Sequence, residues 1–179
     1  MSRRAGVRGD LEKIAVARGV SAGDEWVTVP AERIREALEA ARGEGYDFFS
    51  FITCVDHLAR DDGRPPFTGP QGEGPPPRFE VVYELRDRDA VRLIRIRAFL
   101  GAENPTIASA HDLFGPANWD EREVWDLFGI RFEGHPDLVR ILLPDDWEGH
   151  PLRRDHPVGG DPVDFSSEHA EWQTRPVKA

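Results

Sequence analysis

Hydrophobic and polar positions in the first part of the chain follow two periods, one typical of helices and one of strands. Apolar residues three and four positions apart predict helices over residues 10–18 and 31–42. Pro30 suits the entry to the second helix, and Gly43 suits its exit. Between the helices, residues 25–29 (EWVTV) are rich in β-branched and aromatic side chains, which favour a strand.

Three further stretches have the pattern of strands. Residues 46–56 are aromatic and β-branched with apolar side chains on both faces, which predicts a covered strand or one with an aromatic edge. Residues 79–85 and 91–100 alternate apolar and polar positions, and the polar turn 86–89 joins them into a predicted hairpin. Helices followed by strands predict an α+β fold, with helices packed on one face of a small, mainly antiparallel sheet.

The polar face of the predicted hairpin carries charges of opposite sign. Glu80 and Glu84 lie on one strand, and Arg95 and Arg97 lie on the other. Such residues pair across neighbouring strands. A solvated sheet face is the simplest interpretation of the two arginines.

Periodicity weakens in two places and divides the chain. Residues 60–78 are rich in proline and glycine and predict a surface loop between two strands. From about residue 131 the pattern fades, and from 144 onward prolines punctuate it. We therefore predict an α+β domain over residues 1–143 and an extended tail over residues 144–179, which is either disordered or wraps along a partner.

One more helix is predicted over residues 119–128 (WDEREVWDLF). Asn118 is a suitable N-cap, and Glu121, three residues later, would complete a capping box. Gly129 is placed to end the helix in the left-handed conformation. Arg122 and Asp126 are four residues apart, a spacing that predicts an ion pair along the helix.

Composition excludes several classes of protein. The chain has 179 residues and a formal net charge of −10, which argues against a nucleic-acid-binding protein. It contains one cysteine, so it holds neither an internal disulfide nor, by itself, an iron–sulfur cluster. Cys54 lies in an apolar run and is expected to be buried. No apolar run approaches the roughly 20 residues of a transmembrane helix. We expect a reducing compartment.

Two kinds of chemistry can be considered for residues 118–157. Glu121, Glu123 and Asp126 could act as general acids or bases, but helix-dipole compensation and ion pairing account for them. His135 and His150 each precede a proline, Pro136 and Pro151, as His156 also does. Proline favours an extended residue before it, so these histidines do not form the helical pairs of a zinc site. No catalytic or metal-binding residue is therefore expected.

Assembly explains this segment better. Tryptophan and arginine are the residue types that anchor protein interfaces, and the segment contains Trp119, Trp125, Trp147 and several arginines. Trp119 and Trp125 could instead belong to the core of the domain. Trp147 follows the last predicted element, so we expect it at an interface. The predicted interface residues are Glu121, Arg122, Glu123, Trp125, Asp126, Phe128, Gly129, His135, Pro136, Leu138, Arg140, Trp147, His150, Pro151, Arg153, Arg154 and Asp155.

The same positions resemble a known family. Residues 121–142 carry ERE, WDLFGI, GHPDL and RIL in order, and residues 145–155 read DDWEGHPLRRD. Both stretches look like the signature of the 30 kDa subunit (the C-type subunit in bacteria) of respiratory complex I. Val139 stands where the family often has arginine, and His156 where an aromatic residue is common; the first could weaken one charged contact.

The resemblance implies a non-catalytic, cofactor-free subunit of the peripheral arm of a proton-translocating NADH–quinone oxidoreductase. It implies two neighbours near the quinone site. One is the 49-kilodalton (D-type) subunit, called the large neighbour below, and the other is the small cluster-bearing (B-type) subunit. FMN, iron–sulfur clusters, NADH and quinone would be bound by partner subunits. The expected location is peripheral, on the cytoplasmic face of the plasma membrane.

Two alternatives stay open at this point. The same family serves membrane-bound hydrogenases and ferredoxin- or deazaflavin-linked dehydrogenases, and nothing in these residues identifies the electron donor. A free-standing hydrolase that uses the Glu121, Glu123 and Asp126 carboxylates is the more remote alternative.

Overall fold

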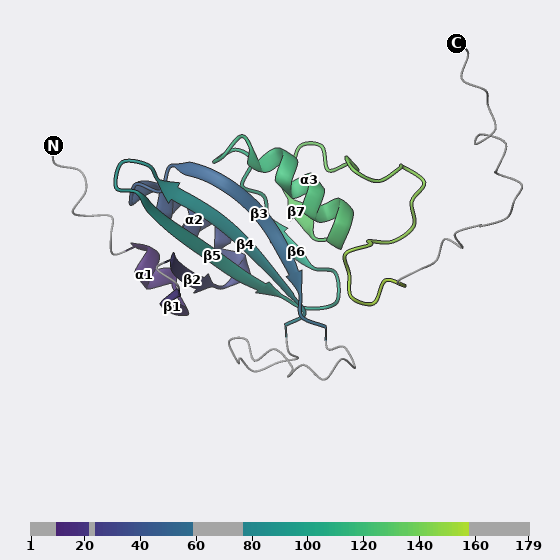
Figure 1. Ribbon diagram of the computed structural model, residues 1–179, viewed down its shortest axis with the longest axis horizontal. Coiled ribbons are helices and arrows are strands. Elements are labelled where there is room, and N and C mark those ends of the chain that lie inside the picture. Colours follow the sequence, from purple (N-terminus) through teal and green to yellow (C-terminus); the bar gives the residue numbers. More distant parts are fainter. Residues whose placement is uncertain (1–9, 22–23, 59–76, 158–179) are drawn as a thin grey trace, which may run out of the picture.

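A five-stranded sheet forms the centre of the molecule (Figure 1). The computed structural model describes residues 10–21, 24–58 and 77–157, so most of the predicted loop 60–78 and all of residues 158–179 lie outside the description. The strand order is β1-β2-β5-β4-β3; β2 pairs with β5 in parallel, and the other pairs are antiparallel. The strands are β1 (Ala17–Ser21), β2 (Asp24–Val29), β3 (Phe48–Asp56), β4 (Phe79–Asp87) and β5 (Arg92–Leu100). The predicted α+β class with a mainly antiparallel sheet is confirmed.

One face of the sheet carries the core. Alternate residues of β4 and β5, such as Tyr83 and Ile96, are fully buried together with Leu38 of helix α2 (Ile34–Gly43). A 3₁₀ turn, η1 (Ala31–Arg33), leads into α2, which lies behind the sheet in Figure 1. Apolar residues on one stripe of α2 thus meet the apolar face of the strands, as their periods predict. Cys54 is buried in this core, as expected.

The first predicted helix is too long. The helix was predicted over residues 10–18, but α1 (Asp10–Ile14) ends at residue 14. The last two residues of the predicted helix, 17 and 18, belong to strand β1. The Val16 amide donates to the Thr28 carbonyl at 2.8 Å, which starts the antiparallel pairing of β1 with β2. Backbone pairing with a neighbouring strand therefore outweighs the weak local preference of this segment for helix.

The second face of the sheet is charged and largely covered by its own side chains. Arg95 Nε donates to Glu84 at 3.1 Å, and Arg97 lies 3.5 Å from Glu80. The predicted cross-strand charge match is confirmed. The two arginines are partly exposed, but the face as a whole is less solvated than expected, because Glu84 is only 2% exposed beneath them.

A second unit covers the free edge of the sheet. Helix α3 (Ala117–Phe128) lies beside β3, on the side of the sheet away from β1 (Figure 1). The Asp120 carboxylate accepts a hydrogen bond of 3.0 Å from the Ile52 amide of β3. This contact satisfies a donor of the edge strand that would otherwise remain open to other chains.

Two short strands that the sequence pattern did not predict flank α3. β6 (Thr106–Ala108) and β7 (Arg131–Glu133) form a parallel pair, so the chain passes through α3 between them. Each strand has three residues, too few for a visible alternation. Residues 134–157 then contain neither helix nor strand and form the yellow-green path in Figure 1.

Candidate partner-docking surface

Helix α3 begins at Ala117 rather than at the predicted Trp119. Its N-cap is Pro116, without a side-chain cap, and Asn118 lies inside the helix. Glu121 therefore does not complete a capping box. Its carboxylate is buried and accepts hydrogen bonds from the Ser109 hydroxyl and, at 2.6 Å, from the Ala110 amide. Burial raises the pKa of Glu121 to about 7, although these two hydrogen bonds oppose the shift.

Asp126 is the centre of the contacts after α3. Its carboxylate is fully buried and accepts hydrogen bonds of 2.9–3.1 Å from the amides of residues 141–143. Arg140 adds an ion pair of 2.6 Å. Burial acts to raise the pKa of Asp126, but these amide and guanidinium contacts outweigh it and lower the pKa. A carboxylate on a helix thereby orders a segment that has no secondary structure of its own.

The predicted pair between Arg122 and Asp126 is wrong. Arg122 instead donates to the carbonyls of Val139 and Arg140, at 3.1 and 3.4 Å. Asp126 is on the buried side of α3, where the amides of the following segment reach it. A local spacing rule cannot anticipate a partner fourteen or more residues away.

Arg140 links this centre to the next turn of the chain. Besides its pair with Asp126, it donates to the Trp147 carbonyl at 2.9 Å. Its guanidinium also lies 5.7 Å from the centre of the half-buried Trp125 ring. His150 binds the Asp126 carbonyl through Nδ1 at 2.9 Å. Each of these contacts is made within the chain.

The last described residues return to the domain. Arg153 Nε donates to the Phe128 carbonyl at 2.5 Å, and the Arg154 amide donates to Asp56 at 2.9 Å. Asp155 pairs with Arg78 at 2.7 Å, and Arg78 also pairs with Asp56. Residues 150–155 are thus held against the end of α3 and the end of β3.

Gly129 makes this close return feasible. Its φ is 73°, the left-handed C-cap predicted for α3. A Cβ atom at this position would lie 2.5 Å from the side chains of His150 and Arg153. Glycine is therefore required here by backbone conformation and by space together.

The three carboxylates that were considered for catalysis do not converge on one site. Glu121 is engaged by Ser109, Asp126 by the segment after β7, and Glu123 is exposed. His135 and His150 bind backbone carbonyls; His135 Nε2 lies 3.0 Å from the Asn118 carbonyl and His150 Nδ1 lies 2.9 Å from that of Asp126. Within residues 10–21, 24–58 and 77–157, no three side chains of metal-ligating type come together.

Most predicted interface residues therefore hold this chain together, whereas Trp147 and three apolar residues that were not predicted face outward. We call the exposed large apolar side chains of residues 134–157 the outer patch: Val139, Leu142, Trp147 and Leu152, which are 39–59% exposed. Their backbones are tied to one place, because Leu142 binds the Asp126 carboxylate, Leu152 the Leu127 carbonyl and Trp147 the Arg140 guanidinium. Exposed apolar side chains on a backbone held in this way are candidates for a protein-binding surface.

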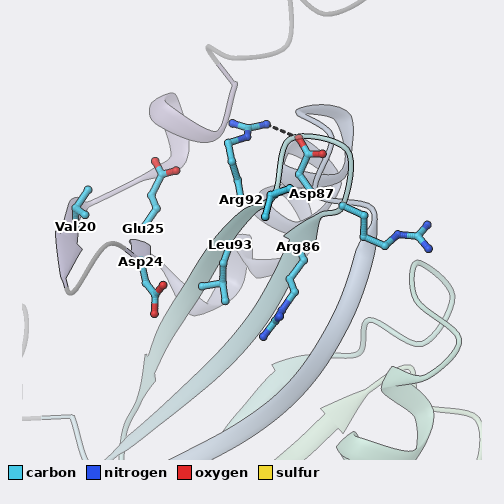
Figure 2. Close-up of a pocket in the computed structure, with 9 residues that line it drawn as sticks. Val20, Asp24, Glu25, Arg86, Asp87, Arg92 and Leu93 are labelled. Carbon is cyan, nitrogen blue, oxygen red and sulfur yellow. Dashed lines mark hydrogen bonds and ion pairs between the residues drawn. The ribbon is translucent and has the colours of Figure 1, made fainter.

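One hollow lies away from the candidate surface, and another adjoins it. The first, of about 650 Å³, lies at the tip of the β4–β5 hairpin. The charged side chains that line this hollow already have partners within the chain; Figure 2 shows one such pair, Arg92 with Asp87. None of the predicted interface residues lines it. The other, of about 480 Å³, lies between α3 and β7 and includes Trp125, His135 and Leu138. The second hollow thus adjoins the candidate surface.

Three residues important to this arrangement were not predicted: Ser109, Asp56 and Arg78. Ser109 holds Glu121 from the segment after β6, and Asp56 meets Arg154 from a position 98 residues away in sequence. No local pattern marks such contacts. The division of the chain at residue 143 stays a prediction. None of the helices in the described ranges has the length and apolar character needed to span a membrane.

Comparison with known proteins agrees with the signature. The family model for the 30 kDa subunit of respiratory-chain NADH dehydrogenase matches residues 27–162. NADH-quinone oxidoreductase subunit 5 of Thermus thermophilus is 43% identical over 149 residues, which are 80% of this chain and 66% of that protein. The C-type NADH-quinone oxidoreductase subunit of Salinispora tropica is 37% identical over 87% of this chain and 57% of its own length. The chain thus spans two thirds or less of these relatives.

Solved structures show the same fold. A trypsin-resistant fragment of Nqo5 is 34% identical, with a TM-score of 0.57, over 74% of this chain and 96% of that one. A chain of an archaeal membrane-bound sulfane sulfur reductase has a TM-score of 0.66 at 23% identity, which indicates a shared fold alone. The chain therefore belongs to the family of the 30 kDa subunit of respiratory-chain NADH dehydrogenase.

Proposed function

We propose that the chain is a non-catalytic, cofactor-free subunit of the peripheral arm of a proton-translocating NADH–quinone oxidoreductase. Its role is to support assembly and stability beside the large neighbour and the small cluster-bearing subunit, near the quinone site. FMN and the iron–sulfur clusters belong to partner subunits. The complex would hold the chain peripherally at the cytoplasmic face of the membrane.

One observation carries this proposal: the family signature holds a segment without helix or strand in a fixed shape. Asp126, Arg140 and His150 form the contacts, and the outer patch faces away from them. A surface that is ordered before binding loses less conformational entropy when a partner docks. Of the three acids considered for catalysis, Glu121 and Asp126 accept hydrogen bonds from groups within the chain, and Glu123 is exposed.

Trp147→Ala tests the surface directly. If Trp147 anchors the partner, recovery of the complex with a tagged full-length chain from its native host should fall by an amount equivalent to about 2 kcal/mol or more. Phe48→Ala is the matched control, because Phe48 is an aromatic residue of β3 with a similar exposure of 42%. If Trp147→Ala and Phe48→Ala reduce recovery of the complex equally, or if neither reduces it, the assignment of the outer patch is contradicted.

The identity of the recovered subunits distinguishes the related machines. Recovery of the large neighbour with flavin- and NADH-binding subunits supports the NADH–quinone complex. A nickel-binding large subunit would instead indicate a membrane-bound hydrogenase. A chain that is recovered alone, at native expression levels, would overturn the proposal.

A further inference from the structure

We infer that the outer patch docks into a protein groove that is apolar at its floor and lined by lysine or arginine at its rim. The inference rests on the proposed function and adds the chemistry of the partner. It starts from the turn 144–149, where Trp147 stands among Asp145, Asp146 and Glu148. All four of these side chains are exposed.

The three acids differ from the three carboxylates of the signature that are engaged within the chain. Glu121, Asp126 and Asp155 each bind a donor within the chain. By contrast, no residue in the described part of the chain forms an ion pair or a side-chain hydrogen bond with Asp145, Asp146 or Glu148. Their charge is thus available to a partner.

The guanidinium that binds the backbone of this turn is engaged with other groups. Arg140 lies beneath the turn, but its nitrogens bind Asp126 and the carbonyls of Trp147 and Gly149. It shapes the turn through the backbone and leaves the carboxylates unpaired. Since the whole chain has a formal charge of −10, its own surface offers little compensation.

The turn is ordered before any partner arrives. The Trp147 amide donates to the Pro144 carbonyl at 3.0 Å, and Gly149 has a φ of 83° that lets the chain reverse toward α3. Arg140 closes the turn from inside at 2.9 Å from the Trp147 carbonyl. The backbone that carries the indole and its acidic neighbours is therefore held in one conformation.

These features select one class of occupant. An exposed tryptophan is well accommodated by an apolar slot, and three unpaired carboxylates favour cations around that slot. Nucleic acids and anionic lipid surfaces would be repelled by the same charges. A basic-rimmed apolar groove on a protein satisfies both requirements.

Charge reversal of the turn is the test. The tagged full-length chain carrying Asp145→Lys, Asp146→Lys and Glu148→Lys is compared with the wild-type chain, and both are recovered from the native host with their partner subunits at about 50 mM and about 500 mM salt. The control carries Glu12→Lys, Glu32→Lys and Glu103→Lys, the same change in charge at exposed sites outside residues 139–155.

We expect the turn variant to lose partner recovery by about tenfold or more at low salt, the control to bind normally, and wild-type recovery to fall with salt. Equal recovery of the turn variant and the control, with wild type bound, would overturn this inference and leave the proposed function standing. A wild-type chain that recovers no partner at either salt would overturn the proposed function itself. A second variant carries Asp145→Asn, Asp146→Asn and Glu148→Gln, which remove charge at nearly constant shape. It should show a smaller loss of partner recovery. If this variant binds like wild type at low salt, the partner does not recognise the charge of the turn.

Discussion

Asp126 and Arg140 form a buried ion pair of 2.6 Å, with the Asp126 side chain fully shielded from solvent. The pair joins α3 to a segment that has no helix or strand. Its geometry gives most of the family signature a structural explanation. Asp126 holds the amides of residues 141–143, and Arg140 extends the contact to Trp147.

Removal of this carboxylate should destabilise the chain strongly. Asp126→Ala leaves three amides without their acceptor and Arg140 without its ion-pair partner, and the expected loss in free energy of unfolding is about 3–5 kcal/mol. Denaturant titration of the purified chain measures it. Glu123→Ala removes an exposed acid of the same helix and should change stability by less than about 0.5 kcal/mol. Similar effects of the two changes would show that the Asp126 contacts are not formed in solution.

Glu121 should make stability depend on pH in the neutral range. Its pKa in the folded chain is about 7, against an ordinary value of 4.5, because it is buried with Asp112 and Asp120 nearby and without a cationic partner among its contacts. Below pH 4.5 the carboxyl is protonated in both states. As pH rises from 4.5 to 7, the unfolded chain releases the proton first, so the free energy of unfolding falls, by at most about 3 kcal/mol.

Glu121→Gln removes that titration while it keeps the size of the side chain. We expect a flatter stability profile between about pH 5 and 7 and a variant more stable than wild type near pH 8. Thermal melts across this range provide the measurement. A profile that keeps its wild-type slope would assign the pH dependence to other groups.

Gly129→Ala should displace residues 150–153. A left-handed backbone costs a side-chain-bearing residue about 1–2 kcal/mol, and the new methyl group would meet His150 and Arg153 at 2.5 Å. We expect a loss of at least about 2 kcal/mol and faster proteolysis after α3. Gly115→Ala is the control, since no atom lies within 4 Å of the place that its new methyl group would occupy. If both substitutions are tolerated equally, residues 150–153 do not pack closely against Gly129 in solution.

Val91 should be replaceable with a gain in stability. It lies in the β4–β5 turn, just before β5, with a φ of 51° and a side chain that is 90% exposed. A β-branched residue is strained in this conformation, whereas asparagine tolerates it. Val91→Asn is expected to stabilise the chain by about 0.5–1 kcal/mol in thermal melts, and Val16→Asn, at an exposed valine with ordinary φ, should not. A loss at position 91 would show that the valine makes a contact in solution.

Sequence patterns predicted the elements that are long and periodic. In α2 and in the β4–β5 hairpin the same spacing of apolar residues recurs several times, so an accidental match to the pattern is improbable. The end of α3 was predicted from the single glycine at position 129. β1, β6 and β7 were missed because they are short and take their stability from the strand beside them. Propensity within three to five residues cannot compete with such pairing.

The residues of the signature were recognisable from the order of their side chains, but their roles were not. An isolated Asp126 or Arg154 looks the same whether it faces a partner protein or its own chain. Only the folded chain brings Asp126 to residues 141–143 and Asp56 to Arg154, across 98 positions of sequence in the second case.

Family membership and the α+β class thus follow from the sequence alone. The order of the signature residues indicates the family, and the periodicity of apolar residues indicates the class. The tertiary structure decided which signature residues are used internally and which apolar side chains, those of the outer patch, remain exposed. The physical reason is that burial and hydrogen-bond partners depend on distances between segments, and no local pattern of residues encodes those distances.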